Sequence, residues 1–68
     1  MKQIAFFSGT VTYSKVGNDE TVATVRGKIQ HPVLGMESVV YTSIVVKKND
    51  DGGFETLNTI YKPFPTQE

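Results

Sequence analysis

The chain lacks cysteine altogether and has a single histidine and a single arginine, Arg26, among its 68 residues. Without cysteine there is no disulfide framework, no thiolate nucleophile and no thiolate metal site, which are common supports for so short a domain. The seven basic and seven acidic residues cancel, so no net charge attracts nucleic acid or an anionic surface from a distance. We therefore expect stability to come from packing or from self-association.

Long hydrophobic runs are missing as well. No stretch approaches the roughly 20 apolar residues that cross a bilayer. The apolar start, Met1–Phe7, is too short for the apolar region of a signal peptide. We therefore expect a cytoplasmic protein that forms one domain over residues 1–68, with residues 62–68 as a tail, and has no membrane partner.

Helix-forming residues are scarce, whereas β-branched residues are abundant. Alanine and leucine occur twice each, but valine, isoleucine and threonine together account for 21 of the 68 residues. Branched side chains fit a pleated strand better than a helix. The composition predicts an all-β fold with little or no helix.

Turn-forming residues divide the chain into four strand-like runs. These runs cover residues 4–14, 21–30, 38–48 and 54–62, and residues 31–37 read as a loop. Short connections favour an antiparallel meander, which we expect to form a curled sheet or a small open barrel. Gly9 and Gly27 lie in the middle of strands, where glycine marks sharp bends, and are candidate corners.

Two of the runs are apolar on both faces. Alternation places Val39, Tyr41 and Val45 on one face of the third run, while its other face also carries valine and isoleucine. Phe6 and Phe7 oppose one another in the same way in the first run. A single sheet without helices covers only one face, so we expect a homo-oligomer whose interface uses these five residues. The alternative is a closed barrel whose second face is partly covered by residues 63–65.

Candidate catalytic groups are few. His31 precedes Pro32 in a predicted loop, where a histidine more often caps a backbone carbonyl than acts as a general base. The pairs of acidic residues fall in predicted turns and lack the spacing of a calcium loop. We expect no catalytic residue, no metal site and no cofactor.

Polar groups on predicted strands are the better candidates for binding. Arg26 is the only bidentate phosphate or carboxylate fork, and Lys28 lies on the same polar face of the second run. We predict a contact surface that combines these two cations with Thr42, Ser43 and Asn58. The alternative is a solvated face whose charges discourage aggregation.

Three segments of the second half of the chain form a further pattern: His31-Pro32, the valine-rich run 40–45 with its Thr-Ser pair, and the segment 55–61 with a Thr-x-Asn-Thr-x-Tyr-like ending. This pattern resembles that of short proteins of bacterial viruses and prophages. It covers roughly 30 residues.

The resemblance implies a viral accessory protein that acts by binding rather than by catalysis. Such proteins often inhibit host immunity stoichiometrically, so the implied partner is a host defence protein or a small anionic nucleotide that serves as its signal. The first alternative is a protein that binds single-stranded DNA through an open β-barrel, although zero net charge disfavours nucleic acid. The second is a minor structural protein of the virus particle.

Overall fold

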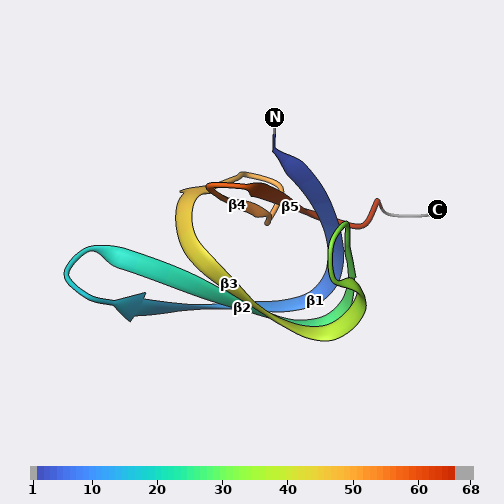
Figure 1. The fold of residues 1–68 in the computed structure, drawn as a ribbon, viewed down its shortest axis with the longest axis horizontal. Helices are drawn as coiled ribbons and strands as arrows, with labels where there is room; N and C mark the ends of the chain where they lie inside the picture. The colour runs from blue at the N-terminus through green and yellow to red at the C-terminus, as the bar shows by residue number, and fades with distance from the viewer. Residues whose placement is uncertain (1, 66–68) are drawn as a thin grey trace.

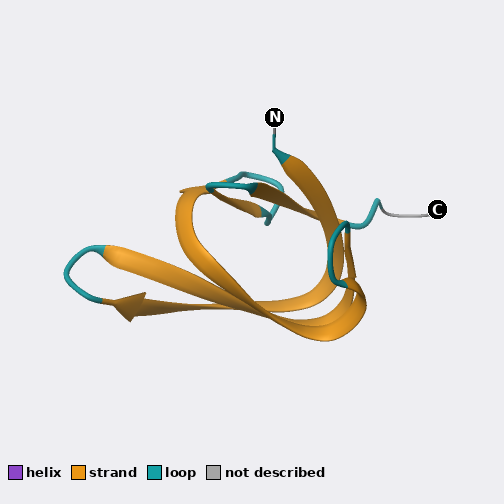
Figure 2. Cartoon of the chain, in the orientation of Figure 1, coloured by secondary structure: helices purple, strands orange, loops and turns teal. Residues whose placement is uncertain are grey.

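Five strands form one closed barrel in the computed structural model, which describes residues 2–65 (Figures 1 and 2). The strands are β1 (Gln3–Val16), β2 (Glu20–His31), β3 (Gly35–Lys48), β4 (Phe54–Thr56) and β5 (Thr59–Pro63). They follow one another as a meander, and each sequential pair is antiparallel. Residues 2–65 contain no helix, so none there could cross a membrane. The prediction of an all-β meander is confirmed.

The number of strands differs from the expected four because the last run divides in two. Leu57 and Asn58 make a reversal that separates β4 from β5 and places Phe54 directly opposite Tyr61. With an odd number of meandering strands, the first and last run in the same direction. β5 accordingly pairs in parallel with the start of β1, from Gln3 to Phe7, and the barrel is closed rather than open.

Gly9 and Gly27 form the predicted corner and lie directly opposite each other in β1 and β2. Both have positive φ, +129° and +139°, which side chains rarely allow. A Cβ atom on Gly9 would lie 2.1 Å from the Arg26 carbonyl oxygen, and one on Gly27 would lie 2.1 Å from that of Ser8. The two strands therefore bend together because neither residue has a side chain.

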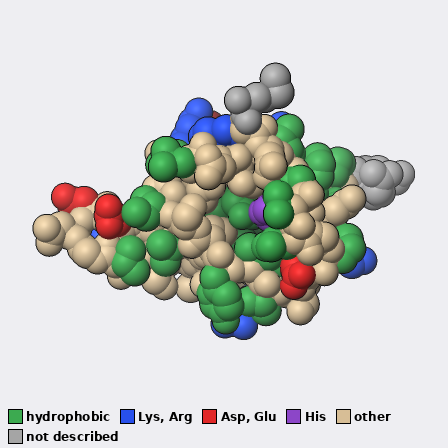
Figure 3. All heavy atoms as spheres, viewed as in Figure 1, with side chains coloured by type: hydrophobic (Ala, Val, Ile, Leu, Met, Phe, Trp, Pro, Cys, Tyr) green, Lys and Arg blue, Asp and Glu red, His purple; other side chains and the backbone are tan. Residues whose placement is uncertain are grey.

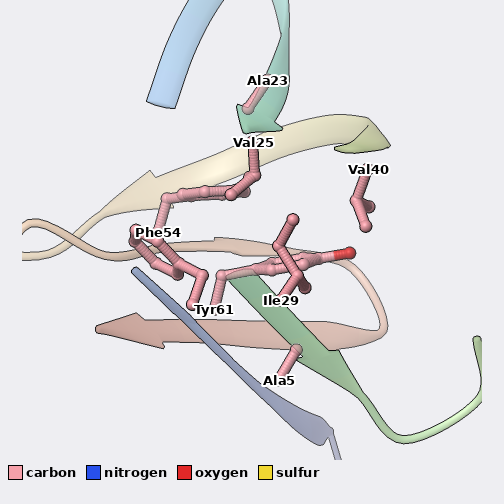
Figure 4. Packing of buried hydrophobic residues seen from close by; sticks show 8 residues of the cluster. Ala5, Ala23, Val25, Ile29, Val40, Phe54 and Tyr61 are labelled. Carbon is pink, nitrogen blue, oxygen red and sulfur yellow. The ribbon is translucent and has the colours of Figure 1, made fainter. Parts of the chain in front are cut away.

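The core is a small aromatic cluster inside the barrel (Figure 4). Phe54 and Tyr61 stack at 4.7 Å between ring centroids, and Tyr13 meets Phe54 edge-on at 5.9 Å. The buried apolar side chains come from all five strands: Ala5, Phe7, Ala23, Val25, Ile29, Val40, Phe54 and Tyr61. Full burial of one large side chain contributes about 1.5–3 kcal/mol, so each aromatic residue is a large part of the stability of a short chain.

A bulge in β3 changes which valines face inward. The three-residue step from Tyr41 to Ile44 on β3 lies opposite only a two-residue step, from Thr24 to Val22, on β2. The extra residue shifts the alternation, so Val45 packs against the core instead of sharing a face with Tyr41. The predicted grouping of Val45 with Tyr41 and Val39 on one interface is therefore wrong.

The start of β1 carries a second correction to the predicted interface. Phe7 lies inside the barrel with only 4% of its surface exposed, so it is not available to a partner. Phe6 points outward and is half-buried because Phe64 stacks on it at 5.9 Å. Closure of the barrel thus buries Phe7 and Phe64 covers part of Phe6, whereas Tyr41, Ile44 and Val46 of β3 stay exposed.

β1 and β2 continue beyond the barrel as a projecting hairpin, the arm, which ends in the turn 17–19 (Figure 1, left). β3 pairs with β2 as far as Val22, and the remainder of the arm is two-stranded. The Lys48 ammonium nitrogen lies 4.0 Å from the ring centroid of Tyr13, and this side chain therefore covers the base of the arm on the side of the core. The arm extends the outward surface of β1 and β2 beyond the part of the sheet that β3 joins.

Candidate binding surface

The outer surface of β1, β2 and β3 presents hydroxyl, basic and aromatic side chains in register. One row runs from Thr10 through Arg26 to Val39, and the next from Thr12 through Thr24 to Tyr41. Side chains of directly opposed residues are neighbours on the same face of a sheet. We call this surface the outer face and define it by Thr10, Thr12, Thr24, Arg26, Lys28, Val39 and Tyr41.

The outer face has two cations that form no ion pair within residues 2–65. Arg26 and Lys28 are exposed, and within residues 2–65 the ion pair between Lys2 and Glu55 is the only one. Their charge is therefore available to an acidic partner. An arginine fork binds carboxylates in a bidentate manner, which adds geometric selectivity to charge.

Tyr41 is the most conspicuous group of the outer face because 75% of its surface is exposed. It lies opposite Thr24 and next to the row that contains Arg26. An exposed tyrosine offers a large, rigid contact area with a polar tip, and tyrosine and arginine are enriched among residues that dominate binding energy. The sequence assigned Tyr41 to an oligomer interface; its position joins it to the predicted cationic site.

Thr42 and Ser43, both predicted to bind a partner, occupy the bulge of β3. The hydroxyl of Thr42 accepts a hydrogen bond from the backbone N–H of Ala23 at 3.1 Å and donates one to the Ser43 carbonyl at 2.9 Å. These bonds satisfy backbone groups that the bulge removes from the regular ladder. Thr42 thus has a structural role beside the outer face, and Ser43 is exposed next to it.

Asn58 is not brought together with the predicted cations. It lies exposed in the β4–β5 turn, where its carbonyl accepts a hydrogen bond from the N–H of Gln3. Arg26 instead pairs with Thr10, seven residues farther along β1. The neighbouring Thr56 and Thr59 are buried, and the Thr56 hydroxyl donates to the Thr59 carbonyl at 3.4 Å. The hydroxyls of this segment stabilise a turn.

Thr10 and Thr12 are residues of the outer face that the sequence reasoning missed. Their signal is the alternation in Ser8-Gly9-Thr10-Val11-Thr12-Tyr13-Ser14, which places hydroxyl side chains at every even position. The apolar residues of the same segment predict its core face but do not indicate a role for the opposite face. Exposure of both threonines confirms the alternation.

His31 holds the β2–β3 turn together. Its Nδ1 accepts hydrogen bonds from the backbone N–H groups of Val33 and Leu34, at 3.1 and 3.3 Å. A neutral ring whose Nδ1 accepts must carry its proton on Nε2, which then donates to Tyr61 Oη at 3.3 Å. Burial raises the pKa of Tyr61, so this phenol keeps its proton. Both ring nitrogens therefore form hydrogen bonds that stabilise the fold.

Within residues 2–65 no cluster of histidine and acidic side chains has the geometry of a metal site. This part of the chain also encloses no pocket. The outer face is an open surface, and Figure 3 shows the arm as a largely uncharged stretch with acidic side chains at its tip. Open surfaces suit macromolecular partners, whereas small molecules are usually bound in concave sites.

No family model matches the chain, and no curated protein and no solved structure matches it.

Proposed function

We propose that the protein is a non-enzymatic binding protein that uses the outer face to dock on the acidic surface of another protein. The observation that carries this proposal is the grouping of exposed Tyr41 with Arg26 and Lys28, which lack ion-pair partners within residues 2–65, on one rigid sheet. Contacts held by strands are better positioned than contacts on loops. We propose that this partner is a host defence protein and that binding inhibits it, as the resemblance to viral accessory proteins implies.

The charge of the outer face supports an acidic protein as partner. Threonine hydroxyls beside Arg26 and Lys28 both donate and accept hydrogen bonds, which suits carboxylates flanked by backbone groups. Val39 and Tyr41 supply the apolar contact that a stable interface needs at its centre. A free nucleotide signal is the less favoured partner because the outer face offers it no concave site.

Site-specific crosslinking tests the proposal in living bacteria. A photoreactive p-benzoylphenylalanine replaces Tyr41 in one variant and Leu57 in a matched control, since the two residues are 75% and 72% exposed. Leu57 lies in the β4–β5 turn, outside the outer face. We expect position 41 to capture a defined protein that position 57 does not capture, and mass spectrometry to identify it.

Binding measurements with the purified proteins then determine how much Arg26 contributes to the affinity. Arg26→Ala removes a charge-assisted contact worth about 1.5–3 kcal/mol and should weaken binding of the captured protein roughly tenfold or more. Lys62→Ala, which removes an exposed cation of β5, should bind like the wild type. Equal capture from both crosslinking positions, or unchanged binding by Arg26→Ala, would refute the proposal.

Binding of single-stranded DNA is the second candidate, favoured by the same exposed tyrosine. Bases stack on aromatic side chains, and a neighbouring arginine adds attraction to phosphate. In that case an oligothymidine should bind at physiological salt, with affinity falling steeply as salt rises. Tyr41→Ala should then weaken the binding by about 1–3 kcal/mol per stacked base. Absence of such binding in a fluorescence anisotropy titration rejects this candidate.

A further inference from the structure

The arm leaves one edge of β1 without a partner strand. β1 pairs with β2 from Phe6 to Val16, but β5 covers its other edge only from Gln3 to Phe7. Residues 8–16 thus have no second partner strand within the described chain. Unpaired strand edges are templates for pairing with another strand.

The direction of the backbone groups on this edge follows from contacts at its start. The Gln3 N–H and the Phe7 carbonyl both bond toward the β5 side, to Asn58 and Phe64. Alternate residues of a strand direct these groups to the same side, and the pairing with β2 continues to Val16 without a shift of register. The N–H and carbonyl groups of Gly9, Val11, Tyr13 and Lys15 therefore point to the open edge.

We propose that this edge pairs with the same edge of a second copy of the chain, antiparallel and about a two-fold axis at Thr12. In this register Val11 and Tyr13 of the two copies exchange backbone hydrogen bonds, and Gly9 faces Lys15. Antiparallel pairing about a two-fold axis is self-complementary, as the interface of a symmetric dimer must be. The outer faces of both copies then join into one continuous sheet surface.

The side chains favour a second copy over an unrelated strand. Residues 10–14, Thr-Val-Thr-Tyr-Ser, are uncharged, rich in β-branched and aromatic residues, and meet themselves across the axis. The single charge of the edge, Lys15, opposes glycine rather than another lysine. The pairing also brings the arm tip, which carries Asp19 and Glu20, toward the end of β5 in the other copy, where Lys62 is exposed.

The axis provides a test that depends on register, because position 12 faces itself. Thr12 is exposed, so Thr12→Asp and Thr12→Lys each place like charges directly opposite while sparing the core. Sedimentation velocity should show the wild type as a dimer and each variant alone as a monomer. An equimolar mixture of the two variants should restore the dimer, because aspartate then faces lysine.

Thr24→Asp is the matched control, since Thr24 lies opposite Thr12 in β2 but one strand away from the edge. It should remain dimeric, and circular dichroism should show that all three variants keep the strand spectrum. A wild type that sediments as a monomer at tens of micromolar overturns the proposal. So does a mixture of the two charged variants that stays monomeric while both are folded, because the axis would then lie elsewhere.

Discussion

Tyr61 connects the core to the only histidine. Its ring stacks on Phe54, and its hydroxyl accepts a hydrogen bond from His31, whose other nitrogen holds the turn at residues 32–34. Burial raises the pKa of the phenol because the anion would lose its hydration inside the barrel. One side chain thus joins β5, the end of β2 and the turn that follows it.

Tyr61→Phe should change how stability depends on alkaline pH. A group whose pKa is raised on folding stabilises the native state below its ordinary pKa, here 10.0, and loses that contribution as pH rises further. The wild type should therefore lose more unfolding free energy than Tyr61→Phe between pH 8 and pH 11. At pH 8 the variant should lack the hydrogen bond to His31, worth about 0.5–1.5 kcal/mol.

Urea titrations of both proteins at the two pH values measure this difference. Lysines titrate in the same range but are common to both, so they cancel in the comparison. Parallel losses in the two proteins would show that Tyr61 ionises as easily in the barrel as in the unfolded chain.

Glu55 provides a corresponding test in acid. The Lys2 ammonium, 2.9 Å from Glu55 Oε1, is the main cause that lowers the pKa of this carboxyl, and the side-chain amide of Asn49 adds a weaker hydrogen bond. A lowered pKa means that Glu55 stabilises the fold above its ordinary value of 4.5 and loses this contribution as pH falls below it. Because the pair is partly solvated, the effect is small.

Glu55→Gln should flatten the acid limb of the stability curve. Chemical denaturation at pH 7 and pH 3 should show a smaller loss for the variant than for the wild type, and Lys2→Met should behave in the same way. A variant that loses as much stability in acid as the wild type would show that the ion pair contributes nothing in solution.

At the scale of elements, the paired glycines determine where β1 and β2 bend. Gly27→Ala places a Cβ atom 2.1 Å from a backbone oxygen that cannot move without disrupting the bend. Gly35→Ala also meets positive φ, +81°, but finds open space. Strain alone costs on the order of 1–3 kcal/mol, so the control should fold with reduced stability. Gly27→Ala should lose considerably more and fail to give the native spectrum.

Thermal unfolding followed by circular dichroism distinguishes the two variants. If both glycine variants lose the same stability, backbone strain would account for the bend and the close approach of the strands would not matter.

The elements show how far the sequence was informative. Turn residues and β-branched content predicted the meander, and the two glycines in the middle of strands predicted the corner at Gly9 and Gly27, because these signals are local. The sequence did not predict the bulge at Thr42 and Ser43, because a single extra residue is defined only by the pairing with β2 and leaves the local sequence pattern unchanged. The sequence also did not predict the reversal at Leu57 and Asn58, because this turn contains neither glycine nor proline.

At the scale of the whole molecule, the closed barrel accounts for where the predicted functional residues lie. Phe7 lies inside the closed barrel and the bulge of β3 turns Val45 toward the core, whereas Tyr41 stays outside, in the row next to Arg26 on the β1–β2–β3 sheet. The sequence identified Arg26 and Lys28 from their charge on a polar strand. Their association with Tyr41 and the separation from Asn58 required strand pairing between distant residues, which a linear pattern does not specify.

The most direct test of the central claim is a nuclear magnetic resonance titration of the isotope-labelled protein with the partner captured at position 41. The account predicts that shifted and broadened amides cluster at Thr10, Thr12, Thr24, Arg26 and Tyr41. Amides of the β4–β5 turn should stay unchanged. Perturbations confined to that turn or to residues 32–34, with an unaffected outer face, would contradict the claim that this protein binds through the β1–β2–β3 sheet.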